Sequence, residues 1–124
     1  MPNQAQSPND KKTYDLEDRT ARFGEAVIGL VKTFPQDPVN SPLISQIVRA
    51  ATSVGANYME ADGAESKKDC QHKISICKKE AKETKHWLRM LAEANPDRRD
   101  ECQNLFKEAQ ELTLIFSSIL LASK

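Results

Sequence analysis

One stretch of the sequence decides the fold: Lys67–Ala94, which reads KKDCQHKISICKKEAKETKHWLRMLAEA. It contains neither Gly nor Pro, and its apolar residues recur at alternating spacings of about four and three. Ser66 stands directly before it as a candidate N-cap, with Asp69 three residues later, and Asn95 and Pro96 follow its end. Together these signals predict one long amphipathic helix over residues 67–94.

The same spacing recurs in three other segments, at about residues 15–34, 41–61 and 97–122. Pro35 and Pro38 separate the first two, and Ser41 followed by Pro42 predicts where the second begins. Because all four apolar stripes repeat at about 3.5 residues, they suit helices that cross at about 20°. Short connections favour neighbours that run in opposite directions. The sequence therefore predicts an all-α fold, an antiparallel up-down-up-down four-helix bundle spanning residues 13–124.

Length and composition agree with a single helical domain. The chain has 124 residues, only 4 Gly, and equal numbers of basic and acidic residues, so its formal net charge is zero. A neutral chain argues against a protein whose whole surface attracts nucleic acid, because such domains are usually basic. A local basic patch remains compatible with this balance.

The ends and the cysteines indicate the compartment. Residues 1–12 are polar and lack an apolar core, which predicts a disordered tail rather than a signal peptide. Cys70, Cys77 and Cys102 form no Cys-x-x-Cys pair, and their odd number indicates free thiols in a reducing compartment. The longest apolar run, residues 112–121, is about half the length that a bilayer requires. We therefore expect a cytoplasmic protein.

Most basic residues of the central segment fall on one flank when its apolar stripe faces inward. Several are like-charged neighbours three or four residues apart, which costs a few tenths of a kcal/mol per pair. This arrangement suggests an anionic partner, and RNA or DNA held through its phosphates is the candidate. The alternatives are an ordinary solvated face, or pairing with Glu101, Glu108 and Glu111 within the chain or between subunits. The candidate nucleic-acid-binding residues are Lys67, Lys68, Lys78, Lys79, Lys82, Lys85 and Arg89.

The last helix is apolar on more than one side. Leu114 and Leu121 lie roughly opposite its inward stripe, and Ile115 and Leu120 fill the sides. A four-helix bundle covers only one side of each helix, so the second face predicts contact between subunits. The competing interpretation is a short apolar end covered by the N-terminal tail. Trp87 is a further candidate for a packing or interface anchor.

Motifs for catalysis and metal binding are weak. A di-iron bundle needs Glu-x-x-His on two helices, but Glu83 to His86 supplies one copy, and its weaker echo lies on the same helix. Cys70 and Cys77 fall on the inward stripe, where buried structural thiols are expected. No glycine-rich phosphate loop or activated nucleophile is recognisable. We therefore expect no catalytic residue, no metal and no cofactor, and a metal-dependent enzyme is a remote alternative.

Two runs of the sequence resemble a known family. The first is Ser-Val-Gly-Ala-Asn-Tyr-Met-Glu-Ala at residues 53–61, and the second is Lys-Glu-Ala-Lys-Glu-Thr-Lys-His-Trp-Leu at residues 79–88. Together they resemble the bacterial four helix bundle protein family, first noticed as reading frames inside intervening sequences of large-subunit ribosomal RNA genes and once labelled as a ribosomal protein. The resemblance covers about residues 14–123.

This resemblance implies a four-helix bundle that assembles as a ring, expected to be a pentamer, with no established catalytic activity. It also implies structural similarity to the accessory protein of diversity-generating retroelements, which works with a reverse transcriptase and nucleic acid. Four polar residues match the family pattern and leave the core side by helical phase: Asn57, Glu60, Glu80 and Glu83. We interpret them, together with Trp87, as a polar network between helices or subunits.

The leading hypothesis is thus a non-enzymatic, oligomeric bundle protein that binds nucleic acid or a nucleoprotein. The alternative is a structural or protein-interaction module whose basic residues pair with acidic residues of neighbouring subunits.

Overall fold

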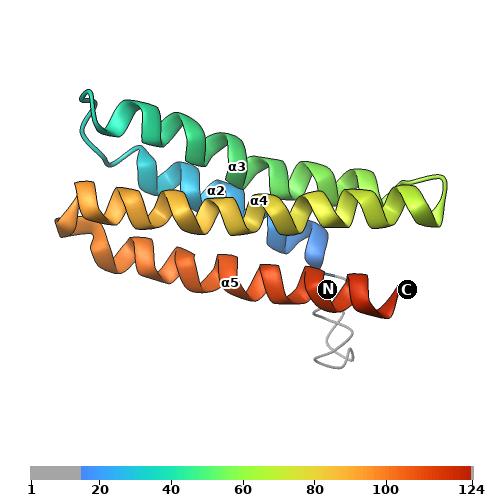
Figure 1. Ribbon diagram of the computed structural model, residues 1–124. Coiled ribbons are helices and arrows are strands. Elements are labelled where there is room, and N and C mark those ends of the chain that lie inside the picture. Colours follow the sequence, from blue (N-terminus) through green and yellow to red (C-terminus); the bar gives the residue numbers. More distant parts are fainter. Residues whose placement is uncertain (1–14, 124) are drawn as a thin grey trace, which may run out of the picture.

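The computed structural model describes residues 15–123 and consists of four α-helices joined by short connections (Figure 1). They are α2, Leu16–Val31; α3, Asn40–Asp62; α4, Lys67–Ala94; and α5, Arg99–Ala122, with a short 3₁₀-helix, η1, at Pro96–Arg98. No strand occurs in this part of the chain. The expected tail at residues 1–12 lies outside the described residues, as do residues 13, 14 and 124.

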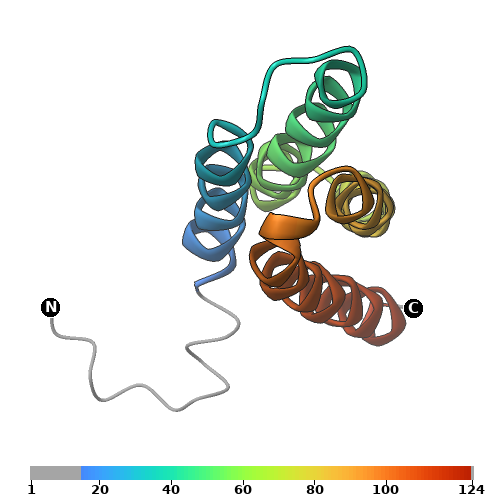
Figure 2. The ribbon, with the colours of Figure 1, turned by 90° about the vertical axis from the view of Figure 1, so that its left-hand side faces the viewer.

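Successive helices run in opposite directions, and the four lie side by side as a bundle (Figures 1 and 2). In the end view α2 lies across from α4, and α3 lies across from α5. The most extensive contacts join α3 to α4 and α4 to α5, whereas α2 meets α5 over a shorter seam. The predicted all-α four-helix bundle is therefore confirmed. Within residues 15–123, none of the helices combines the length and the apolar character needed to cross a membrane.

Local signals set most helix ends. The α4 helix has the predicted bounds, and the Ser66 hydroxyl accepts a hydrogen bond from the Asp69 backbone N–H at 3.0 Å. The prediction that Ser41 caps α3, with Pro42 as its first helical residue, is wrong by two residues. The Asp37 carboxylate accepts from the backbone N–H of Asn40 at 2.7 Å, so the helix begins at Asn40. The first helix ends at Val31, three residues earlier than predicted, and the chain continues from there as a turn.

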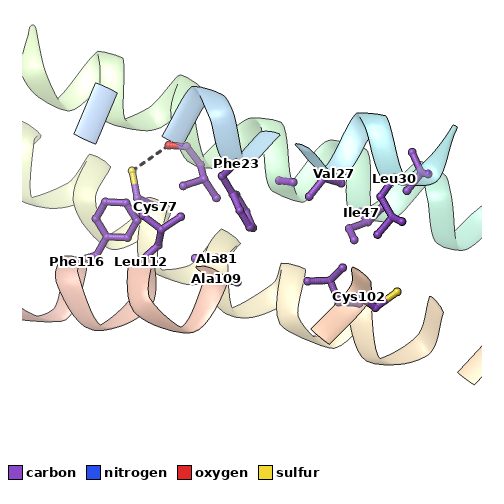
Figure 3. Close-up of a cluster of buried hydrophobic side chains, with 14 of the residues drawn as sticks. Phe23, Val27, Leu30, Ile47, Cys77, Ala81, Cys102, Ala109, Leu112 and Phe116 are labelled. Carbon is purple, nitrogen blue, oxygen red and sulfur yellow. Dashed lines mark hydrogen bonds between the residues drawn. The ribbon is translucent and has the colours of Figure 1, made fainter. Parts of the chain in front are cut away.

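The core runs through the middle of the bundle and draws on all four helices (Figure 3). Cys77 lies inside it, and its thiol donates to the Val54 carbonyl oxygen at 3.4 Å. Cys102 and Thr113 of α5 are also buried. Leu105 of the same helix is half-buried. The largest fully buried apolar side chains are Leu16, Val27, Ile47, Val54, Leu88, Leu91, Leu112 and Phe116.

Candidate functional site

Arg49 of α3 holds two carboxylates of α4. Its Nη1 lies 3.2 Å from Oε1 of Glu80, and its Nη2 pairs with Glu83. The indole N–H of Trp87 donates to the same Glu83 carboxylate at 3.0 Å. Glu80 is only 7% exposed, although helical phase had placed it outside the core. The cation of Arg49 offsets the cost of burying this carboxylate, so these contacts stabilise the α3–α4 interface.

The remaining residues of the predicted polar network lie elsewhere. The Asn57 side-chain amide donates to the carbonyl and hydroxyl oxygens of Ser53 at 2.9 Å, within its own helix. Glu60 pairs with Lys73. The structure therefore forms one cluster around Arg49 and leaves Asn57 and Glu60 outside it. Sequence reasoning missed Arg49 because the nearer of its two carboxylate partners, Glu80, is 31 positions away in the chain.

Arg19 of α2 engages two acidic residues that were candidates for pairing with the basic residues of α4. Its Nε lies 2.7 Å from Glu108 Oε2, and its Nη2 lies 2.8 Å from Glu111 Oε1. Hydrogen bonding to Glu108 raises the pKa of Arg19, so this guanidinium group stays charged. Glu101 pairs instead with Arg98 at 2.9 Å. Within the chain these acids therefore pair with Arg19 and Arg98, and the alternative of pairing with the α4 lysines is left to contacts between subunits.

The basic stripe of α4 is left without ion-pair partners among residues 15–123. Five of its members are exposed, and Lys78 and Lys85 are half-buried. Like charges at such close spacing repel one another, and a bound anion would offset this repulsion. The basic stripe consists of Lys67, Lys68, Lys78, Lys79, Lys82, Lys85 and Arg89.

A groove between α4 and α5 adds further cations beside the basic stripe. It has a volume of about 440 Å³ and lies between the C-terminal part of α4 and the N-terminal part of α5. Arg89 of the stripe lines it together with Arg99 and Lys107 of α5, and Glu93 contributes one opposing charge. Sequence reasoning missed Arg99 and Lys107, because helical phase within one helix does not show what a neighbouring helix brings beside it. We call this the α4/α5 groove.

An aromatic ring stands in the α4/α5 groove. Phe106 lines the groove and is 38% exposed. The ammonium group of Lys85 lies 5.7 Å from the ring centroid and donates to the side-chain oxygen of Gln110. This distance is within the range of a cation–π interaction. The cationic surface of α4 and α5 therefore combines positive charge with an accessible aromatic ring.

The candidate interface residues of α5 divide by exposure. Leu114 is 56% exposed and Leu121 is 68% exposed. Ile115 and Leu120 are half-buried and pack against the core, as does Trp87 on α4. The two exposed leucines are therefore the members of this set that offer free apolar surface in a single subunit.

A second groove, lined by acidic residues, lies between α2 and α3. These two helices lie on the side of the bundle opposite α4 and α5 (Figure 2). The volume of this acidic groove is about 590 Å³, and its charged lining consists of Glu17, Asp18 and Glu25. Exposed Ile28 and Met59 also line it. The charged lining of this groove is thus entirely acidic, whereas that of the α4/α5 groove is mainly basic.

Few side chains of residues 15–123 are arranged as the groups of a catalytic centre usually are. This part of the chain contains no group of three or more His, Cys, Asp or Glu side chains placed to hold a metal ion. Glu83, from the single Glu-x-x-His match, is engaged by Arg49. Burial raises the pKa of Cys77 to about 12 and that of Cys102 to about 11. Neither thiol therefore forms an appreciable amount of the nucleophilic thiolate at neutral pH.

Comparison with known proteins places the chain in a family. The model of the 23S rRNA-intervening sequence protein family matches residues 12–118. A crystal structure from Bacteroides thetaiotaomicron, described as a protein with unknown function from the S23 ribosomal protein family, aligns with a TM-score of 0.73 and 30% identity. The alignment covers 85% of this chain and 97% of the other. A search of curated proteins found no match. The chain therefore belongs to the 23S rRNA-intervening sequence protein family.

Proposed function

We propose that this protein is a non-enzymatic, oligomeric helical-bundle protein that binds RNA or DNA through the basic stripe and the α4/α5 groove. One observation carries the proposal: the cations of the stripe lack ion-pair partners among residues 15–123, while Glu101, Glu108 and Glu111 of α5 are engaged by Arg98 and Arg19. A nucleic-acid backbone would supply the missing negative charge. The family's link to intervening sequences of 23S rRNA is consistent with such a ligand.

Binding of this kind depends mainly on phosphates and carries little sequence information. Each neutralised phosphate releases counterions, so the logarithm of the affinity falls linearly with the logarithm of the salt concentration. We therefore expect binding to generic oligonucleotides that weakens steeply between about 50 and 200 mM salt.

The test compares two double charge reversals that change the net charge equally. Lys82→Glu/Arg89→Glu removes two exposed cations of the basic stripe. Arg22→Glu/Lys32→Glu removes two exposed cations away from the stripe, Arg22 in α2 and Lys32 directly after it. Arg22 pairs with Asp18 on the surface, which contributes little to stability. We expect the first variant to lose affinity and to show a shallower salt slope, and the second to bind nearly as tightly as the original protein. Equal losses in both would contradict a local binding surface.

A second candidate function is supported by the acidic groove. Because the acidic groove and the α4/α5 groove lie on opposite sides of the bundle, copies of the chain could associate head to tail, with the basic groove of one against the acidic groove of the next. Such heterologous contacts close into rings when the rotation between copies allows it. In this alternative the basic stripe is covered in the assembly and serves a structural or protein-interaction role.

The triple variant Lys78→Glu/Lys82→Glu/Lys85→Glu separates the two functions. If the stripe binds nucleic acid, the variant loses binding and keeps its mass in solution. If the stripe pairs with neighbouring subunits, the variant has a lower mass, and the original protein shows no salt-dependent binding. Analytical ultracentrifugation and fluorescence anisotropy on the same samples measure both quantities. We propose a ring, and a pentamer in particular, as the assembly to test against the measured mass.

A further inference from the structure

The α4/α5 groove has a chemical composition that a simple phosphate-binding surface does not need. Its floor includes Leu88, Ala92 and the buried Cys102, and its rim carries Arg89, Arg99 and Lys107. Its volume of about 440 Å³ lies in the range of small-molecule sites. The groove therefore suits a ligand with both a flat apolar part and negative charge.

Phe106 is the distinguishing feature of this groove. Among the described residues it is the one aromatic side chain in the set of large, exposed apolar residues. The ammonium group of Lys85 lies over its ring and donates a hydrogen bond to Gln110, and this bond keeps the cation beside the ring. An aromatic ring flanked by cations is the arrangement by which proteins stack a nucleobase and hold its phosphates.

We propose that the α4/α5 groove binds an unpaired base of single-stranded nucleic acid, stacked on Phe106, with the flanking phosphates against Arg89, Arg99 and Lys107. This inference rests on the proposed function and makes it specific for single strands. In a duplex each base is covered by its neighbours, so a duplex can use only the cations. Stacking tolerates any base, so the preference concerns strandedness and not sequence.

The test uses fluorescence anisotropy with the full chain and three labelled ligands of equal length: a single strand, the corresponding duplex, and an abasic strand that keeps the phosphates. Single strands of RNA and of DNA are both measured, since each offers unpaired bases. We expect the single strand to bind more tightly than the abasic strand. Phe106→Leu should weaken binding of the single strand about 5- to 150-fold, and should leave binding of the duplex and of the abasic strand unchanged.

Phe106→Trp is the matched control, because it keeps an aromatic surface and should retain single-strand affinity. It also supplies a direct signal: stacking of a base should quench the fluorescence gained at position 106, and the duplex should not. Because Phe106 is partly exposed, both variants are expected to fold, which circular dichroism verifies.

The outcomes separate this inference from the proposed function. Equal affinity for single strand and abasic strand, with no effect of Phe106→Leu, would overturn the base-stacking site and leave phosphate binding intact. Absence of salt-dependent binding to all three ligands would overturn both.

Discussion

Asn40 and Asn95 exchange two hydrogen bonds at the buried end of the bundle, where α3 begins and α4 ends. Each side-chain amide donates to the other's carbonyl oxygen, at 3.0 and 2.9 Å. Asn40 also donates to the Pro35 carbonyl and Asn95 to the Leu91 carbonyl. The two side chains are 2% and 5% exposed, so water cannot replace a lost partner. This pair therefore fixes the connection between α2 and α3 against the end of α4.

Removing one asparagine of this pair should destabilise the protein by more than the loss of that side chain's volume alone would. Asn40→Ala leaves the Asn95 amide without its partner, and we expect a loss of about 2–3 kcal/mol in the free energy of unfolding. Asn95→Ala should cost a similar amount. Because each single change already removes the shared hydrogen bonds, the double variant should lose less than the sum, as a double-mutant cycle in urea measures. Strictly additive losses would show that the pair contributes no coupling.

The cluster around Arg49 predicts a difference between two glutamates of the same helix. Glu83→Ala removes one of the two carboxylate partners of Arg49 and the acceptor for the Trp87 indole, so we expect a loss of about 1–2 kcal/mol. Glu93 is exposed and forms no ion pair with residues 15–123, so Glu93→Ala should change stability by less than about 0.5 kcal/mol. Thermal unfolding and solution mass are measured for both variants. Unchanged stability and unchanged mass for Glu83→Ala would rule out a structural role for the cluster.

These residues also show what the sequence could and could not predict. The bounds of α4 were predictable because each end has a local signal, Ser66 at the start and Asn95 followed by Pro96 after its end. The burial of Glu80 was not, because it depends on Arg49 from another helix. A charged residue at the edge of an apolar stripe faces water unless a tertiary partner is present, and helical phase does not reveal that partner.

The same limit applies to the candidate site. The basic stripe lies on one helix, so its side chains could be grouped from their spacing alone. Phe106, Arg99 and Lys107 join that surface only when α5 packs antiparallel to α4. The acidic groove likewise combines residues of α2 and α3. Sites made by two helices require the pairing and register of those helices, which the apolar pattern of each does not contain.

The buried thiols predict a loss of stability at alkaline pH. Burial raises the pKa of Cys77 to about 12 and that of Cys102 to about 11, against an ordinary value of 9.0. Above pH 9 the unfolded chain releases these protons and the folded chain retains them, so unfolding becomes more favourable as pH rises. We expect the free energy of unfolding to fall between about pH 9 and 12.

Urea titrations across this pH range test the effect. The variant Cys77→Ala/Cys102→Ala is the control: it should be less stable near neutral pH, because it leaves cavities in the core, but its stability should fall less steeply above pH 9. An identical slope in the two proteins would assign the alkaline loss to other groups, such as Tyr58, whose pKa burial also raises.

Leu114 and Leu121 predict self-association, because they expose apolar surface on the outer face of α5. The double variant Leu114→Lys/Leu121→Lys should lower the mass in solution and leave the helical content unchanged, since neither side chain is part of the core. Val39 is 59% exposed and lies in the connection before α3, so Val39→Lys is a control that should keep the original mass. Sedimentation at micromolar concentration measures all three proteins. A monomeric original protein would show that these leucines do not mediate assembly, and a lower mass in the Val39→Lys control would mean that the effect is not specific to α5.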